Sequence, residues 1–136
     1  MVRSLEEKLE FKKKLEERTS VFTVSVFRCL DTLPKIPSSK VITFQLGKSA
    51  SSVGANYREA TRAESRDDFG HKLQIALKES AETCYWLEIL VDLHPMHGVV
   101  KDLLSEAYEL RNMLQSMSLK TRRKNLKTSI PQNLKN

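Results

Sequence analysis

Four prolines divide the 136-residue chain into long stretches that suit helices. Pro34 and Pro37 bracket one break, Pro95 marks a second, and Pro131 lies near the end. Proline inside a helix removes a backbone hydrogen bond and clashes with the preceding turn, so long proline-free stretches favour helices. The chain also has only four glycines, too few turn residues for a sandwich or barrel of this length. The sequence therefore predicts an all-α fold.

Apolar residues recur at helical spacing in four stretches. The first ends at residue 33, the second spans about 38–65, the third spans about 67–93, and the fourth follows the turn 94–98 to about residue 122. The longest is expected to reach about 27 residues, or about 40 Å. Short connections make consecutive helices antiparallel. We predict an antiparallel up-down-up-down four-helix bundle that oligomerises.

The sequence offers two alternative start positions for the first helix. Ser4 and Glu7 form a capping-box pattern, which would start the helix early. Thr19 or Ser20 could equally cap a helix that begins later. We therefore divide the chain into a charged helical lead-in (residues 1–18), a four-helix bundle (19–117) and a basic C-terminal tail (118–136).

The net charge of +6 comes from the tail. Residues 118–136 contain no acid, and the rest of the chain is balanced, with 17 basic and 17 acidic residues. Such a tail either binds a polyanion or is a solvated chain end. The basic residues of the tail that we predict to bind RNA or DNA are Lys120, Arg122, Arg123, Lys124 and Lys127.

Three arginines form a second candidate nucleic-acid surface. Arg58, Arg62 and Arg66 recur every four residues, so a continuous helix would place them along one edge, where they could grip phosphates. The alternative is a lattice of surface ion pairs with Glu59 and with the two aspartates that follow Arg66. Because the bundle is charge-balanced, the lattice is the favoured interpretation.

The glycines of the second stretch lie on a strip of small residues. Gly47, Ala50, Ser51 and Gly54 share this strip. Glycine costs a helix about 1 kcal/mol relative to alanine. We expect a neighbouring backbone to approach closely there and offset that cost.

The third stretch has apolar residues on two nearly opposite faces. A helix with two such faces is buried from both sides, and a chain this short is most easily covered there by a second subunit. The predicted oligomer interface consists of Ile75, Trp86, Ile89 and Leu93.

The sequence contains no convincing catalytic constellation. His94 and His97 have a spacing found in some metal sites, but they flank Pro95 in a turn and no acid or cysteine cluster joins them. Solvated turn residues are the favoured interpretation, and a metal-dependent enzyme is the rival. We predict a protein that is not an enzyme, with no catalytic residue, metal or cofactor.

Cysteine usage and hydropathy indicate a cytoplasmic protein. Cys29 and Cys84 lie in apolar stretches and are predicted to be buried thiols of a reducing compartment. Charged residues crowd the first few positions, which argues against a signal peptide. The longest apolar run, 21–27, is far shorter than the roughly 20 residues of a membrane span.

The chain contains several distinctive segments, namely QLGKSASSVGANYREA (45–60), RAESRDDF (62–69), His71–Leu73, Leu77–Glu79 and ETCYWLE (82–88), with the flanking Leu15–Thr19 and Ser118–Arg122. Together these segments resemble the four-helix-bundle family of 23S rRNA intervening-sequence proteins. The resemblance covers about residues 12–124. The chain departs from the family pattern at three positions, with Lys48 for arginine, Ala50 for glycine and Gly70 for an apolar residue.

This resemblance implies a bacterial cytosolic bundle that assembles into a homopentamer around a central channel. It also implies kinship with the accessory protein of diversity-generating retroelements, a basic pentamer that partners a reverse transcriptase and nucleic acid. We therefore expect a non-enzymatic accessory protein that contacts RNA or DNA, with a reverse transcriptase as a partner by analogy. The alternative is a protein–protein adaptor without nucleic-acid contact.

Overall fold

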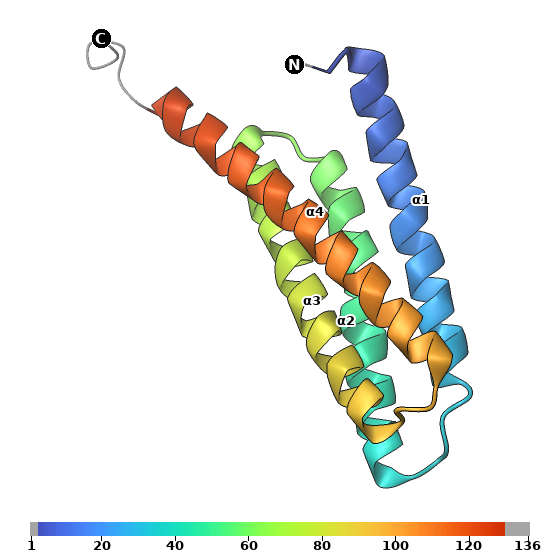
Figure 1. The fold of residues 1–136 in the computed structure, drawn as a ribbon. Coiled ribbons are helices and arrows are strands. Elements are labelled where there is room, and N and C mark those ends of the chain that lie inside the picture. Colours follow the sequence, from blue (N-terminus) through green and yellow to red (C-terminus); the bar gives the residue numbers. More distant parts are fainter. Residues whose placement is uncertain (1–2, 130–136) are drawn as a thin grey trace.

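Four antiparallel helices make up the described part of the chain (Figure 1). The computed structural model describes residues 3–129, and within this range it contains no strand. The helices are α1 (Leu5–Leu30), α2 (Pro37–Thr61), α3 (Arg66–Leu93) and α4 (Gly98–Ser129). The predicted all-α, up-and-down arrangement is confirmed.

Helix α1 begins early and absorbs the charged lead-in. Ser4 is its N-cap, and the Ser4 side chain accepts a hydrogen bond from the Glu7 backbone N–H at 3.2 Å. The helix then continues without a break to Leu30, three residues short of the predicted end at Leu33. Residue 34 is a proline, which disfavours helical backbone at Leu33, so the chain turns there.

The predicted second helix was too long, because the chain already turns at residues 62–65. Helix α2 starts with Pro37 at its first position, where a missing N–H costs nothing. It ends at Thr61 instead of residue 65. Ser65 belongs to the next helix as its N-cap, since its hydroxyl accepts from the Asp68 N–H at 3.0 Å.

Helix α4 is longer than predicted. It has 32 residues and runs to Ser129 instead of about residue 122. No proline or glycine interrupts it after Gly98, and cations near its end suit the negative pole of the helix dipole. The basic segment is therefore helical to Ser129, and the rest of the predicted tail, residues 130–136, lies outside the described residues.

Helices α1 and α2 approach closely at the small-residue strip. A Cβ added at Gly54 would lie 2.9 Å from the Thr19 hydroxyl oxygen, and one at Gly47 would lie 3.1 Å from the Phe27 ring. The expected close approach is confirmed. A side chain at Gly54 would therefore require Thr19 or α1 to shift, whereas at Gly47 the exposed Phe27 ring could move aside.

The two ends of the bundle are packed differently. At one end, here called the closed end, the turns 31–36 and 94–97 connect the helices over buried Leu33, Leu90 and Val100. At the other, the open end, α1 begins and α4 ends, and these two helices diverge on either side of the α2–α3 turn (Figure 1). The α1–α4 contact is the least extensive of the four helix–helix contacts.

Candidate functional site

A cleft of about 910 Å³ lies between α1 and α4 at the open end. Its apolar floor combines side chains of all four helices and the α2–α3 turn, and includes Phe11, Tyr57, Ala60, Phe69, Met113 and Met117. Its rim carries five cations, namely Arg3, Lys8 and Lys12 from the α1 side and Lys120 and Lys124 from α4. Among the described residues that line this cleft there is no aspartate or glutamate.

The three aromatic residues described on the floor are covered to different degrees. Tyr57 is only 2% exposed, and burial raises its pKa to about 12, with a smaller contribution from Glu16. The Arg3 guanidinium lies over the Phe11 ring, 4.6 Å from its centroid. Phe69 packs against the core. The partly exposed apolar side chains described on the floor are therefore Phe11, Ala63, Phe69, Met113 and Met117.

An ion-pair network joins α1 to α4 at the inner limit of the cleft. Arg18 donates from Nε to Glu106 Oε2 at 2.7 Å and from Nη2 to Glu106 Oε1 at 2.6 Å, and it also contacts Glu109. Its Nη1 lies 3.4 Å from the sulfur of Met113, which lines the cleft. The hydrogen bonds from Arg18 lower the pKa of Glu106 below its usual value. This network holds α1 and α4 together just where they begin to diverge.

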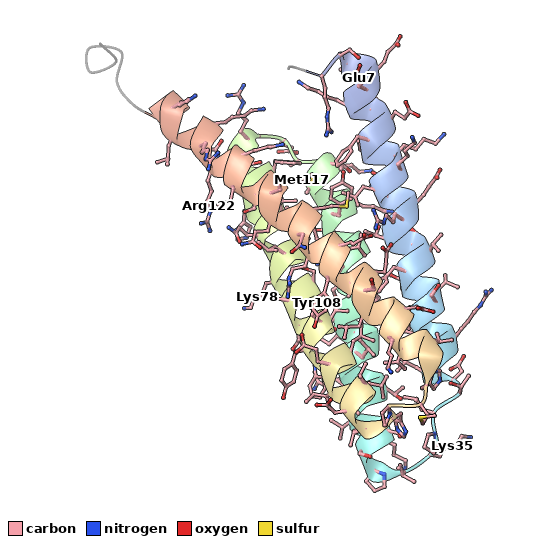
Figure 2. All side chains as sticks on the ribbon, viewed as in Figure 1. Glu7, Lys35, Lys78, Tyr108, Met117 and Arg122 are labelled. Carbon is pink, nitrogen blue, oxygen red and sulfur yellow. The ribbon has the colours of Figure 1, made fainter. Side chains whose placement is uncertain are left out.

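The predicted basic residues at the end of α4 point in several directions. Lys120 and Lys124 line the cleft. Arg122 turns toward α3 (Figure 2), where the Gln74 side chain, with its amide oxygen facing α4, accepts from Arg122 Nε at 3.0 Å. Arg123 and Lys127 are exposed. The end of α4 is thus cationic on more than one side.

Arg58, Arg62 and Arg66 do not lie along one helix edge as predicted. Arg62 is the C-cap of α2, and Arg66 is the first residue of α3, so the turn at 62–65 separates them. Arg58 donates to Ser20 Oγ of α1 at 3.0 Å. The periodicity of four continued through a turn by coincidence, and no single edge presents all three guanidinium groups.

The alternative prediction, a lattice of surface ion pairs around these arginines, is also wrong for its main pair, Glu59 with Arg62. Glu59 bonds to Lys72 of α3 at 3.2 Å instead of to Arg62. Arg62 donates to the backbone carbonyl of Arg58 at 3.4 Å.

The structure does bring Arg66 close to the end of α4. Both Arg66 and Lys124 line a depression of about 500 Å³ next to the cleft, together with Glu64, Thr121 and Asn125. Gly70 lies nearby, where an added Cβ would sit 3.3 Å from the Thr121 methyl group. Of the three arginines, only Arg66 thus joins the predicted basic tail.

The predicted oligomer interface on α3 is divided between buried and exposed residues. Trp86 and Ile89 pack partly against the core of their own chain, Ile75 is half-buried, and Leu93 is 49% exposed. The Trp86 indole Nε1 is buried and finds no hydrogen-bond partner among the described residues. Whether a second copy covers this face stays a prediction.

A second apolar surface was not predicted. It lies along α1 and α2 and consists of Val21, Val24, Phe27 and Phe44, of which Phe44 is 66% exposed. The signal was the apolar run 21–27, which was weighed only as a membrane span. No helix in the described range 3–129 is long and apolar enough to cross a bilayer.

The titratable side chains that the structure describes do not cluster into a metal site. Within residues 3–129 no group of three or more His, Cys, Asp or Glu side chains converges on one point. His97 Nε2 lies 3.3 Å from the Thr32 hydroxyl, and His94 is the C-cap of α3. Cys29 and Cys84 are buried free thiols, as predicted, and burial raises the pKa of each.

The geometry defines an all-α helical-bundle protein with a basic, apolar-floored cleft at one end. Within this class, the model of the 23S rRNA-intervening sequence protein family matches residues 11–116. The chain belongs to that family, and the predicted resemblance is confirmed. The matched range stops before Lys120 and begins after Lys8, so much of the cationic rim lies outside it.

A solved structure shows the same relationship. The chain is 33% identical to a protein of unknown function from the S23 ribosomal protein family of Bacteroides thetaiotaomicron VPI-5482, with a TM-score of 0.69. The similarity covers 76% of this chain and 97% of the other. No curated protein matches the chain.

Proposed function

We propose that this protein is a non-enzymatic accessory protein of the bacterial cytoplasm that binds RNA or DNA through the basic end of α4. The observation that carries this proposal is the helical continuation of the basic segment. Lys120, Arg122, Arg123, Lys124 and Lys127 all lie on α4, with no acid after Glu109 in that helix. A rigid cationic rod is better organised to contact successive phosphates than a frayed chain end.

The surroundings of this rod support the same proposal. Arg66 lies beside it across the 500 Å³ depression, and Arg3, Lys8 and Lys12 of α1 add positive charge across the cleft. The net charge of +6 resides in residues 118–136, because residues 1–117 have 17 basic and 17 acidic residues, so an approaching polyanion is attracted to the open end.

Salt-dependent RNA binding tests the proposal directly. The affinity for a labelled single-stranded RNA is measured by fluorescence anisotropy over a salt series. The logarithm of the binding constant should fall with the logarithm of the salt concentration, with a slope of about −0.7 per phosphate contact. The double variant Arg123→Gln, Lys127→Gln should bind more weakly and with a shallower slope, since both residues are exposed. Neither residue lines the cleft.

A matched control removes the same charge elsewhere. Lys35, at the closed end in Figure 2, and Lys101 near the start of α4 are both exposed. The Lys35→Gln, Lys101→Gln variant has the same net charge as the test variant and should bind like wild type. Equal weakening in the two double variants, or no binding by wild type, would support the adaptor alternative.

We further propose that the chain forms a homo-oligomer, a pentamer by the family resemblance. Two exposed apolar surfaces support self-association, the α3 set that includes Leu93 and the α1–α2 set that includes Phe44. Light scattering of the separate variants Leu93→Glu and Phe44→Glu tests which surface is used. Loss of the oligomer in one variant assigns the interface, and a monomeric wild type at high concentration contradicts the proposal.

A further inference from the structure

We propose that the α1–α4 cleft at the open end binds an acidic amphipathic helix of a partner protein. The proposal goes beyond nucleic-acid binding, because it concerns another surface and another class of partner. Its basis is the shape of the cleft, the chemistry of its floor and the charge of its rim.

The shape is that of a groove between two helices. The part of α4 that lines the cleft extends from Asn112 to Lys124, which is about 18 Å of helix. The opposite wall is the start of α1, and α2–α3 residues close the bottom. A partner helix of about three turns matches this length, and its apolar side chains can enter a volume of about 910 Å³.

The floor suits apolar side chains better than nucleobases. Met113 and Met117 line it from α4, and methionine adapts its flexible side chain to varied apolar partners. Figure 2 shows Met117 on α4 beside the space between the two helices. Base stacking needs free ring faces. Tyr57 is almost fully buried, Arg3 covers Phe11, and Phe69 is the one remaining ring among the described residues of the floor, partly buried against the core.

The rim selects the charge of the partner. Five cations surround the floor, and no described lining residue is acidic. Lysine and arginine can lay their apolar stems along a bound helix while the charged ends stay at the edge. A helix with an apolar stripe flanked by glutamates would satisfy both the floor and the rim, whereas a basic helix would be repelled.

Peptide binding by the full chain tests the proposal. The probes are a panel of fluorescein-labelled 14-residue helical peptides, with Leu, Met or Phe at every third or fourth position and Glu on both flanks. A second panel carries Lys in place of each Glu. Anisotropy should show binding by acidic peptides of the first panel and little binding by the second.

Two variants locate the binding. Lys8→Glu with Lys12→Glu reverses charge on the rim, and Met117→Glu places a charge on the floor. Each should weaken acidic-peptide binding about tenfold or more. Lys8 and Lys12 are not in the core, and acids near the start of α1 suit its helix dipole, so the first variant should stay folded. The control, Lys35→Glu with Lys101→Glu, should bind like wild type.

Three results would overturn the proposal. One is that no acidic peptide binds wild type, and another is that the control and the rim variant weaken binding equally. The third is that wild type binds a twelve-nucleotide oligothymidylate but no peptide, and that Met117→Glu abolishes this oligonucleotide binding. That result would assign the cleft to nucleic acid. Loss of RNA binding in the Arg123→Gln, Lys127→Gln variant tests the proposed nucleic-acid binding and not the peptide cleft, because neither residue lines the cleft.

Discussion

The closed and open ends of this bundle are made from the same four helices but from different side chains. Leu33, Leu90 and Val100 fill the closed end and are almost fully buried. The open end instead has partly buried Met113 and Met117 and a ring of cations. Aliphatic side chains draw helices together, while like charges on facing helices hold them apart. One bundle can therefore combine a stable core with an accessible binding surface.

The largest expected effect is the difference between two core substitutions. Leu90→Ala removes a fully buried side chain and should cost about 2–5 kcal/mol of unfolding free energy. Met117→Ala, at the open end, should cost less, about 1–2 kcal/mol, because its side chain is only partly buried. Urea unfolding of both variants measures this. Equal losses of unfolding free energy in the two variants would mean that the cleft is closed in solution.

Alanine substitutions at two glycines test whether the α1–α2 contact is packed more tightly than the region beside the cleft. Gly54→Ala places a Cβ 2.9 Å from the Thr19 hydroxyl oxygen and 3.1 Å from the Thr19 Cβ, both in a buried, stiff residue. We expect a net loss of about 1–2 kcal/mol despite the better helix propensity of alanine. Gly70→Ala meets only the Thr121 methyl group at 3.3 Å and the Asn125 amide. It should be neutral or stabilise by up to about 1 kcal/mol.

Melting temperatures rank these glycine variants. A destabilised Gly70→Ala together with a neutral Gly54→Ala would reverse the comparison and contradict the described packing.

Arg18 marks the boundary between the two regions, and its removal should have a pH-dependent effect. Arg18→Gln should cost about 1–2 kcal/mol at neutral pH, since it breaks a two-point contact with a partly buried carboxylate. The folded-state pKa of Glu106 lies below its usual value. The stabilisation is therefore complete above the unfolded-state pKa of glutamate and is lost as the pH falls through the lower folded-state value.

Urea unfolding of wild type and Arg18→Gln at neutral and acidic pH checks this. The two proteins should converge in acid. A gap that stays constant with pH would show that Arg18 acts through packing alone.

The smallest expected effect concerns Glu79, away from the cleft. Its Oε2 is buried without a hydrogen-bond partner among the described residues, and burial raises its pKa, with a further contribution from Glu82. A raised folded-state pKa means that its contribution to stability is present below the unfolded-state pKa and lost as the pH rises through the folded-state pKa. Glu79→Gln should therefore stabilise slightly at neutral pH and have no effect in acid. Neutral-pH destabilisation of this variant would contradict the assignment.

The helices could be predicted because their signals are local. Prolines and apolar spacing act within one or two turns, so four helices followed from the sequence. The Ser4–Glu7 pattern was one of two starts that the sequence left open for the first helix, and the structure has this one. The α2–α3 turn was predicted a few residues too late, after residue 65 instead of after Thr61, because arginines spaced by four imitate a continuous helix edge. Ser65 was the available counter-signal, as a cap residue followed three positions later by Asp68.

The cleft could not be predicted from local signals, because its two walls lie more than a hundred residues apart in sequence. Lys8 and Lys12, four residues apart, share one helix face with no indication of what they oppose. Only the up-and-down topology places that face near Lys120 and Lys124. The predicted basic tail thus supplies two of the five rim cations, and the other three, Arg3, Lys8 and Lys12, come from the predicted charged helical lead-in.

Because the number of antiparallel helices is even, the two ends of the described chain lie at the same pole of the molecule (Figure 1). A purification tag or fluorescent protein fused at either end would therefore stand beside the cleft and the basic part of α4. Such a fusion could obstruct the surfaces that it is meant to report on. A cysteine label in the turn 94–97, such as at the exposed Met96, would place the reporter at the opposite pole and leave both surfaces clear.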